Sequence, residues 1–118
     1  MNILFLENHA VFARQVTQQF LAAHFVTVVP SLAKARAALS NNHYDLILSD
    51  FDLDDGKGDE FVRECRLDHP QLPVIAASAH EAGSQALLKA GAAAVCGKLK
   101  FDRIQQVIDS LRREQSDQ

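Results

Sequence analysis

Polar residues follow four separate apolar runs of the sequence, at or just after the point where each run ends. They are Glu7 with Asn8, Asp50, Ser78 and Lys98. Together they suit phosphoryl transfer, in which acids hold a divalent cation, one carboxylate attacks phosphorus, and a cation with a hydroxyl steadies the transferred oxygens. One such residue alone is usually a solvent-facing cap, but groups from four strands indicate a common site.

The most acidic stretch is DLILSDFDLDDGKG, which spans residues 45–58 and contains five aspartates. Crowded carboxylates repel one another unless a cation or water relieves them, so the stretch predicts either a solvated turn or a cation or phosphoryl site. Asp50 directly follows the apolar run and is the candidate nucleophile, with Asp52 beside it. Asp54 and Asp55 are expected in a loop.

Two other motifs fail on this stretch. Counted from Asp50, a calcium-binding loop requires a glycine at its sixth position and a glutamate at its twelfth, where this chain has Asp55 and Phe61. The D-x-D pair also resembles the nucleophile motif of haloacid-dehalogenase-type phosphatases. Those proteins carry the motif on the first strand of a much larger domain, whereas here it follows the third predicted strand.

Short apolar runs with little alternation predict strands that are covered on both faces, as in a parallel sheet. The runs span residues 3–6, 25–29, 46–48, 74–77 and, more weakly, 92–96. Helical spacing fills the intervals, and Ser31 and Asp102 are the expected N-caps of the second and last helices. Five alternations of strand and helix predict a doubly wound α/β domain, whose ligands bind at the carboxyl ends of the strands.

Length and composition predict one domain, residues 1–118, with a frayed tail over residues 114–118. The chain is 47% hydrophobic, and its net charge of −3 gives no general attraction to nucleic acid or to an anionic membrane. No apolar run approaches the length of a membrane span, and the start lacks signal-peptide features. Cys65 and Cys96 are expected to be reduced, which favours the cytoplasm, and the five histidines show no zinc-ligand spacing.

Taken in order, these residues resemble a response-regulator receiver domain of the chemotaxis-regulator type. The resemblance is carried by Asp50 within DLILSDFDL, Gly58, Ser78 within VIAASA and Lys98 within GAAAVCGK. It implies a flavodoxin-like α/β fold with a five-stranded parallel sheet in the order 2-1-3-4-5 and five helices. It also implies that Asp50 is the phosphoacceptor, Ser78 the switch hydroxyl and Lys98 the lysine that pairs with the phosphoryl group.

The resemblance further implies a magnesium site made by Glu7, Asn8, Asp50 and Asp52, the last through its backbone carbonyl. The family usually has an acid where this chain has Asn8, so Mg²⁺ is expected to bind more weakly. Two further departures lie near the lysine. Val95 replaces an aromatic residue of the fifth strand, and Leu99 replaces a proline, so a trans peptide bond is expected before Leu99.

The function implied by the resemblance is phosphoryl acceptance in a two-component or phosphorelay system, with self-catalysed phosphotransfer and autodephosphorylation in place of conventional enzyme turnover. The donor would be a sensor histidine kinase or a phosphotransfer protein, and the signal would pass to a downstream protein. A homodimer is compatible with this scheme, and no nucleic acid or membrane partner is expected. Since the sequence ends with the last predicted helix, we expect no output domain, whether the receiver stands alone or is a piece of a larger protein.

The departures favour an alternative of a different class. A phosphorylation-independent pseudo-receiver would keep the fold and serve as a protein interaction module. Asn8, Val95 and Leu99 support this alternative, because each replaces a residue that the family uses in metal binding or switching. Retention of Asp50, Ser78 and Lys98 opposes it.

Overall fold

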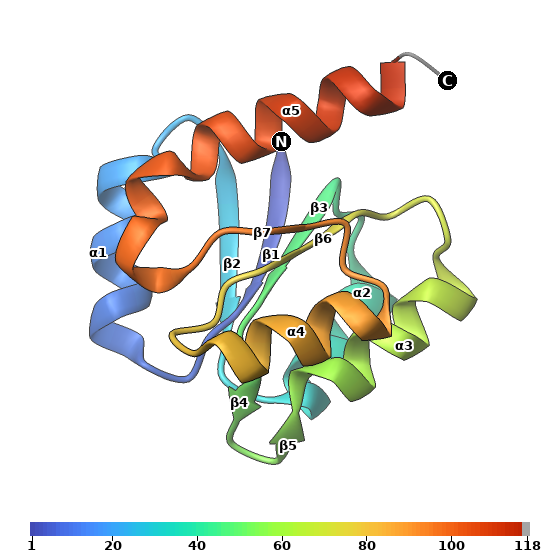
Figure 1. The fold of residues 1–118 in the computed structure, drawn as a ribbon. Coiled ribbons are helices and arrows are strands. Elements are labelled where there is room, and N and C mark those ends of the chain that lie inside the picture. The colour runs from blue at the N-terminus through green and yellow to red at the C-terminus, as the bar shows by residue number, and fades with distance from the viewer. Residues whose placement is uncertain (117–118) are drawn as a thin grey trace.

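The computed structural model describes residues 1–116, and a five-stranded parallel sheet forms its centre (Figure 1). The sheet order is β2-β1-β3-β6-β7, which confirms the predicted order 2-1-3-4-5 because β6 and β7 are its fourth and fifth strands. The strands are β1 (Asn2–Leu6), β2 (Phe25–Val29), β3 (Leu46–Ser49), β6 (Val74–Ala76) and β7 (Ala94–Val95).

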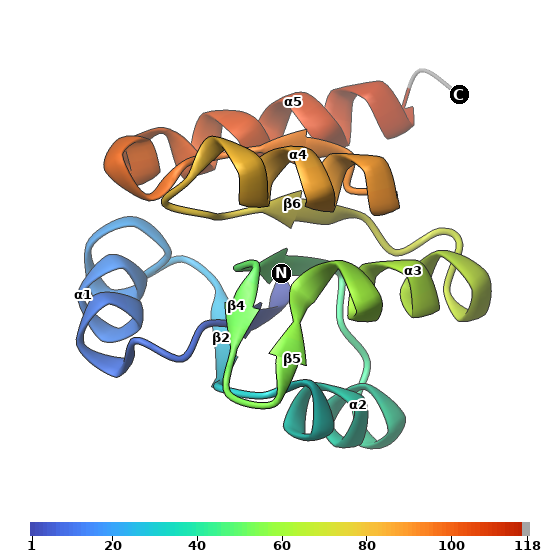
Figure 2. The same ribbon diagram turned by 60° about the horizontal axis from the view of Figure 1, so that its bottom comes forward.

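Helices cover both faces of the sheet (Figure 2). Helices α1 (Ala10–Phe20) and α5 (Ile104–Ser116) pack on one face, and α2 (Leu32–Asn41), α3 (Gly58–Asp68) and α4 (Glu81–Ala90) pack on the other. Each layer has its own hydrophobic core, so the central strands are buried on both sides. This arrangement explains why their sequences are apolar without alternation.

The central strands divide their side chains between the two cores. In β1, Leu4 and Leu6 pack toward α2 and α3, whereas Ile3 and Phe5 pack toward α1 and α5. All four side chains are fully buried. Burial of such a strand supplies a large share of the apolar area removed from water, which fixes the register of the sheet and the position of the strand ends.

A short antiparallel hairpin, β4 (Asp52–Leu53) with β5 (Gly56–Lys57), was not predicted from the sequence. Asp54 and Asp55 form its turn, as expected for loop residues. The Asp55 carboxylate accepts hydrogen bonds from Leu32 N at 2.6 Å and Ala33 N at 3.0 Å. The hairpin therefore satisfies two of the free N–H groups at the start of α2, in addition to the N-cap that Ser31 provides through Lys34 N.

The predicted N-cap at Asp102 is wrong. A 3₁₀ helix, η1 (Lys98–Arg103), contains this residue, and α5 begins at Ile104. The cause is Phe101, which is 2% exposed and stacks on Phe5 with 5.8 Å between the ring centroids. Burying this ring winds the chain into the 3₁₀ turn, so the α-helix starts later than the polar residue suggests.

At the other end, α5 continues through residues 114–116, where the sequence predicted a frayed tail; residues 117 and 118 lie outside the described residues. The Ser116 hydroxyl donates to Arg112 O at 2.9 Å and so satisfies a carbonyl of the last turn. Cys65 and Cys96 are buried and form no disulfide, as predicted, and burial raises the pKa of Cys65 to about 12. No helix within residues 1–116 is both long and apolar enough to cross a bilayer.

Candidate functional site

The carboxyl ends of the strands bring Glu7, Asp50 and Lys98 into contact. Lys98 Nζ lies 2.8 Å from Glu7 Oε1 and 2.8 Å from Asp50 Oδ2. The Glu7 side chain is fully buried, and the side chains of Asp50 and Lys98 are 10% and 18% exposed. The positions of these residues at the strand ends predicted that they share one site, and the structure places all three groups together.

Asp50 is fixed by contacts on both sides of its carboxylate. Asp50 Oδ1 accepts a hydrogen bond from Phe51 N at 2.7 Å, and Oδ2 accepts one from Lys98 Nζ. The backbone of Asp50 continues the sheet, because its N–H donates to Leu6 O at 3.0 Å. Both oxygens of the carboxylate are therefore held in place, one by the backbone and one by the lysine.

Gly58, the first residue of α3, leaves room for the backbone of Asp50. A Cβ atom at this position would overlap the carbonyl oxygen of Asp50 and lie 3.0 Å from Ser49 Oγ. The Gly58 N–H donates to Phe51 O at 2.6 Å, which ties the start of α3 to the loop that follows the acid. Close approach of backbone to backbone explains why glycine stands here.

Two carboxylates share a single ammonium group in this cluster. Burial raises the pKa of Glu7, although Lys98 and the His9 N–H favour its ionised form. Burial alone would lower the pKa of Lys98, but its pairing with Asp50 and Glu7 raises the pKa above the ordinary value. Lys98 is therefore protonated at neutral pH, and the cluster carries excess negative charge when both acids are ionised.

Glu7 is incompletely paired. Its Oε2 accepts a hydrogen bond from His9 N at 3.0 Å. Its Oε1 is buried and makes no contact of hydrogen-bond geometry among the described residues, although it lies at ion-pair distance from Lys98 Nζ. The Lys98 ammonium beside this oxygen is shared with Asp50, so the cluster has room in its charge balance for another positive ligand.

Ser78 lies on the same rim, but its side chain makes a different contact. Ser78 Oγ accepts from His80 N at 3.2 Å, and Gly83 of α4 packs so closely that a Cβ there would lie 2.5 Å from this oxygen. The Ser78 carbonyl accepts from Lys98 N at 3.3 Å. The loop after Ser78 is therefore joined both to α4 and to the lysine, while the hydroxyl proton is left for another acceptor.

The side chains of Asn8 and Asp52, the remaining residues of the predicted metal set, make contacts outside the Glu7–Asp50–Lys98 cluster. Asn8 is exposed, and its Nδ2 donates to Asp54 Oδ1 at 3.3 Å. The exposed Asp52 carboxylate pairs with the Lys57 ammonium. Within residues 1–116, no group of three or more His, Cys, Asp and Glu side chains is arranged to hold a metal ion.

One neighbour of the lysine was not predicted from the sequence. The Phe12 ring of α1 lies 5.2 Å from Lys98 Nζ, a cation–π contact, and meets Phe101 edge-to-face at 5.8 Å between centroids. In the sequence, Phe12 is an apolar residue at helical spacing and looks like any core residue. Only the fold shows that its ring contacts Lys98. Phe12 therefore lies beside the charged end of the lysine and connects it to the buried Phe101 ring.

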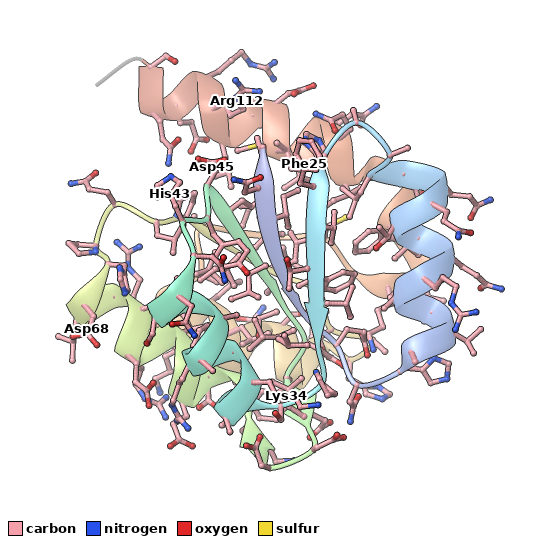
Figure 3. All side chains as sticks on the ribbon, turned by 180° about the vertical axis from the view of Figure 1, so that it is seen from behind. Phe25, Lys34, His43, Asp45, Asp68 and Arg112 are labelled. Atoms are coloured by element: carbon pink, nitrogen blue, oxygen red, sulfur yellow. The ribbon has the colours of Figure 1, made fainter. Side chains whose placement is uncertain are left out.

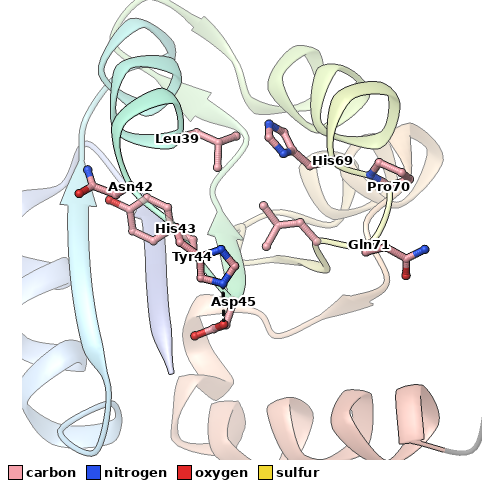
Figure 4. A pocket seen from close by; sticks show the side chains of 9 residues that line it. Leu39, Asn42, His43, Tyr44, Asp45, His69, Pro70 and Gln71 are labelled. Carbon is pink, nitrogen blue, oxygen red and sulfur yellow. Dashed lines mark hydrogen bonds and ion pairs between the residues drawn. The ribbon is translucent and has the colours of Figure 1, made fainter.

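The largest hollows differ in their relation to this cluster. A pocket of about 450 Å³ lies beside it, between the start of α4 and η1, and is lined by Ser78, His80, Val95 and Lys98 among others. Another, of about 460 Å³, lies at the opposite end of the strands, where α2 meets the loops before β3 and β6 (Figure 4). That second pocket holds the surface pair His43 and Asp45 and none of the predicted site residues.

Comparisons with known proteins agree with this geometry. The response regulator receiver domain model matches residues 3–109. Among solved structures, a CheY-like receiver domain protein from Methanospirillum hungatei JF-1 is 20% identical, with a TM-score of 0.83 over 99% of this chain and 98% of that one. A two-component response regulator from Clostridium difficile is 18% identical, with a TM-score of 0.84 over 96% of each chain.

A third solved structure contains bound Mg²⁺–BeF. It is the response regulator protein TrrA from Thermotoga maritima in complex with Mg²⁺–BeF, 17% identical, with a TM-score of 0.83 over 93% of this chain and 97% of that one. At such identities the structures establish the fold alone. The search among curated proteins found no match. Because the family model covers most of the sequence, the chain belongs to the response regulator receiver domain family.

Proposed function

We propose that this receiver domain accepts a phosphoryl group on Asp50 and signals by protein contact. The observation that carries the proposal is the contact between Lys98 Nζ and Asp50 Oδ2 at 2.8 Å, in a cluster where the acid is almost buried. A fixed carboxylate with an ammonium group beside it has both the nucleophile and the cation that phosphoryl transfer requires. The donor class is a phosphohistidine on a sensor kinase or a phosphotransfer protein.

In the proposed step, one carboxylate oxygen of Asp50 donates an electron pair to phosphorus. The bond from phosphorus to the imidazole nitrogen of the donor breaks, and that nitrogen keeps the bonding pair. Lys98 turns from the carboxylate toward the transferred oxygens, and the Ser78 hydroxyl donates a hydrogen bond to one of these oxygens. The product is an aspartyl phosphate held by charge-assisted hydrogen bonds.

A divalent cation fits the donor set of this site, though weakly. The buried Glu7 Oε1 shares the Lys98 ammonium with Asp50, so one positive charge balances two carboxylates and positive charge is in deficit. Glu7 and Asp50 would hold Mg²⁺ with the amide oxygen of Asn8 and the backbone carbonyl of Asp52. When bound, the ion would neutralise charge on the phosphoryl oxygens.

A second candidate function rests on the same departures. Asn8 is engaged with Asp54, and Val95 is a small, 36% exposed side chain where the resemblance leads us to expect an aromatic one. These features favour a pseudo-receiver that binds partners without phosphorylation. The Lys98–Asp50 contact favours the phospho-accepting function, because a domain that had lost phosphotransfer would have no need to keep this contact.

Labelling by a small phosphodonor separates the two functions. The wild-type domain is expected to gain one acid-labile phosphoryl group, seen by intact-mass measurement, only when Mg²⁺ is present. Asp50→Asn should abolish the label, and the matched control Asp54→Asn, in the exposed hairpin turn, should retain it. Absence of label on the wild type, with the fold confirmed by circular dichroism, would favour the pseudo-receiver.

A further inference from the structure

Strand β2 forms one edge of the sheet and lies at the surface between α1 and α2 (Figure 2). Three of its five residues are exposed, and Phe25 at its amino end is 81% exposed (Figure 3). The opposite edge strand, β7, has only two residues. A very short edge resists pairing with another chain, whereas the five-residue edge presents a row of free peptide groups.

The outward-facing peptide groups of β2 belong to Val26 and Val28. Phe25 N donates to Met1 O at 2.9 Å, and Val29 O accepts from Glu7 N at 2.9 Å, so these two residues turn their peptide groups toward β1. Because backbone groups alternate along a strand, Val26 and Val28 turn theirs away from β1. No strand within residues 1–116 lies beyond β2, so the N–H and C=O of both valines have no partner in the sheet.

The sequence of this edge, FVTVV, has none of the usual protection against pairing. It contains no charged residue and no proline, and its register with β1 runs without a bulge. β-Branched and aromatic residues of this kind favour strand pairing. The edge is therefore able to pair with another strand.

Hollows on both faces of the edge match the side chains of an added strand. One, of about 400 Å³, lies toward α1 and is lined by Val28 and Arg14; the other, of about 380 Å³, lies toward α2 and is lined by Phe25 and Thr27. Since successive side chains of a strand point to opposite faces, a paired strand would fill both hollows at once. Of the side chains that line them, only Arg14 carries a permanent charge.

We propose that β2 pairs antiparallel with β2 of a second copy of this chain, about a two-fold axis at Thr27. In this register Val26 lies opposite Val28 of the second copy and exchanges both hydrogen bonds with it, and the symmetry repeats the exchange. All outward peptide groups of both strands gain partners. A register centred on either valine would pair only half of them.

The side chains of the strand are self-complementary in the same register. Thr27 lies opposite Thr27 of the second copy, and Phe25 lies opposite Val29, which are hydroxyl and aromatic–β-branched pairs that stabilise antiparallel strands. No two charges of β2 meet across the axis, because the strand has none. The association goes beyond the proposed function, since β1 lies between this edge and β3, which carries Asp50 at its end, and Asp50→Asn should associate like the wild type.

A charge exchange at the axis tests this interface. Thr27 is exposed, so Thr27→Lys and Thr27→Glu should each leave the fold intact while setting two like charges opposite one another. Each variant alone should dimerise at least about tenfold more weakly than the wild type in sedimentation experiments, and an equimolar mixture should recover a heterodimer. The matched controls Gln106→Lys and Gln106→Glu, on the exposed face of α5, should behave as the wild type.

Amide hydrogen exchange supplies the second measurement on the unmodified chain. Exchange at Val26 and Val28 should slow as protein concentration rises, whereas exchange at Phe25, already bonded to Met1 O, should not change. A wild-type protein that stays monomeric throughout the concentration series would overturn the proposal. So would dimers that persist equally in both Thr27 variants, because the interface would then lie elsewhere.

Discussion

At the scale of single residues, the composition of the site depends on which partner each polar side chain contacts. Glu7 and Asp50 meet at Lys98, but Asn8 bonds to Asp54 and Asp52 pairs with Lys57. The Asn8 amide nitrogen and the Asp52 carboxylate are therefore engaged in local contacts at the surface, whereas the Asn8 amide oxygen and the Asp52 backbone carbonyl take no part in these two contacts. A cation bound there would lack the charge that an acid at position 8 would supply.

The first prediction concerns the charge at position 8. Asn8→Asp would place a carboxylate at the position proposed to hold the cation, so affinity for Mg²⁺ should rise by roughly tenfold or more. Calorimetric titration measures this affinity, and the same variant should be less stable than the wild type when Mg²⁺ is removed. Asn41→Asp, an equal charge change on the exposed end of α2, should leave the affinity unchanged. Equal or weaker binding by Asn8→Asp would mean that residue 8 does not face the cation.

At the scale of elements, the hairpin β4–β5 holds the start of α2. Asp55 accepts from Leu32 N and Ala33 N, and these bonds lower its pKa below the usual aspartate range. Ser31 caps the same helix through Lys34 N with a hydroxyl that does not titrate. One helix end is thus stabilised by one titrating and one neutral side chain.

The second prediction uses this difference. Asp55→Ala should lower the free energy of unfolding at neutral pH, because it removes an ionised acceptor from two helix N–H groups. Since the folded-state pKa of Asp55 is lowered, its contribution is present above the unfolded pKa of about 3.9 and is lost as pH falls below it. Denaturant unfolding across this range measures the loss.

Ser31→Ala is the matched control for that experiment. It should cost about 1 kcal/mol of stability, and the cost should be the same at every pH. A constant difference between Asp55→Ala and the wild type down to low pH would show that Asp55 acts through packing or turn geometry instead of charge.

The elements themselves were largely predictable, and the exceptions share a cause. Continuous apolar runs predicted the strands of the sheet and their positions, because burial on both faces leaves a clear pattern. The hairpin was missed since strands of two residues have no periodicity to detect. The start of α5 was misplaced because burial of Phe101, a tertiary effect, overrode the capping preference of Asp102.

The position of the site was predictable from the sequence, but the directions of several of its side chains were not. Strand ends determine where Glu7, Asp50 and Lys98 come together, and the topology brings these ends to one edge. The directions of the Asn8, Asp52 and Ser78 side chains depend on single partners, namely Asp54, Lys57 and His80. Spacing along the chain carries no information about such choices.

At the scale of the whole molecule, the site is connected more firmly to α4 than to α5. Gly83 of α4 packs against Ser78 Oγ and the Phe51 side chain, so α4 is in close contact with the rim of the site. Toward α5 the path runs through η1, where the buried Phe101 stacks on Phe5 and meets Phe12 edge-to-face. Val95 is too small to relay an inward movement from the rim to this aromatic cluster.

The third prediction follows from that asymmetry. Beryllofluoride with Mg²⁺, a mimic of the acyl phosphate, should shift backbone amide resonances in the loop after Ser78, including His80, and along α4. Resonances of α5 from Ile104 to Leu111 should change little, and Asp50→Asn should show no response. Large changes throughout that part of α5 would mean that coupling survives without an aromatic residue at position 95.

The central claim is that Asp50 itself becomes the acyl phosphate. Phosphorylated protein can be reduced with borohydride, which converts an aspartyl phosphate to homoserine, and peptide mass spectrometry then locates the converted residue. The contact of Asp50 Oδ2 with Lys98 Nζ predicts homoserine at position 50 and at no other aspartate of the 45–58 stretch. Conversion at Asp52 or Asp54, or a phosphoryl label that leaves every aspartate unconverted, would contradict it.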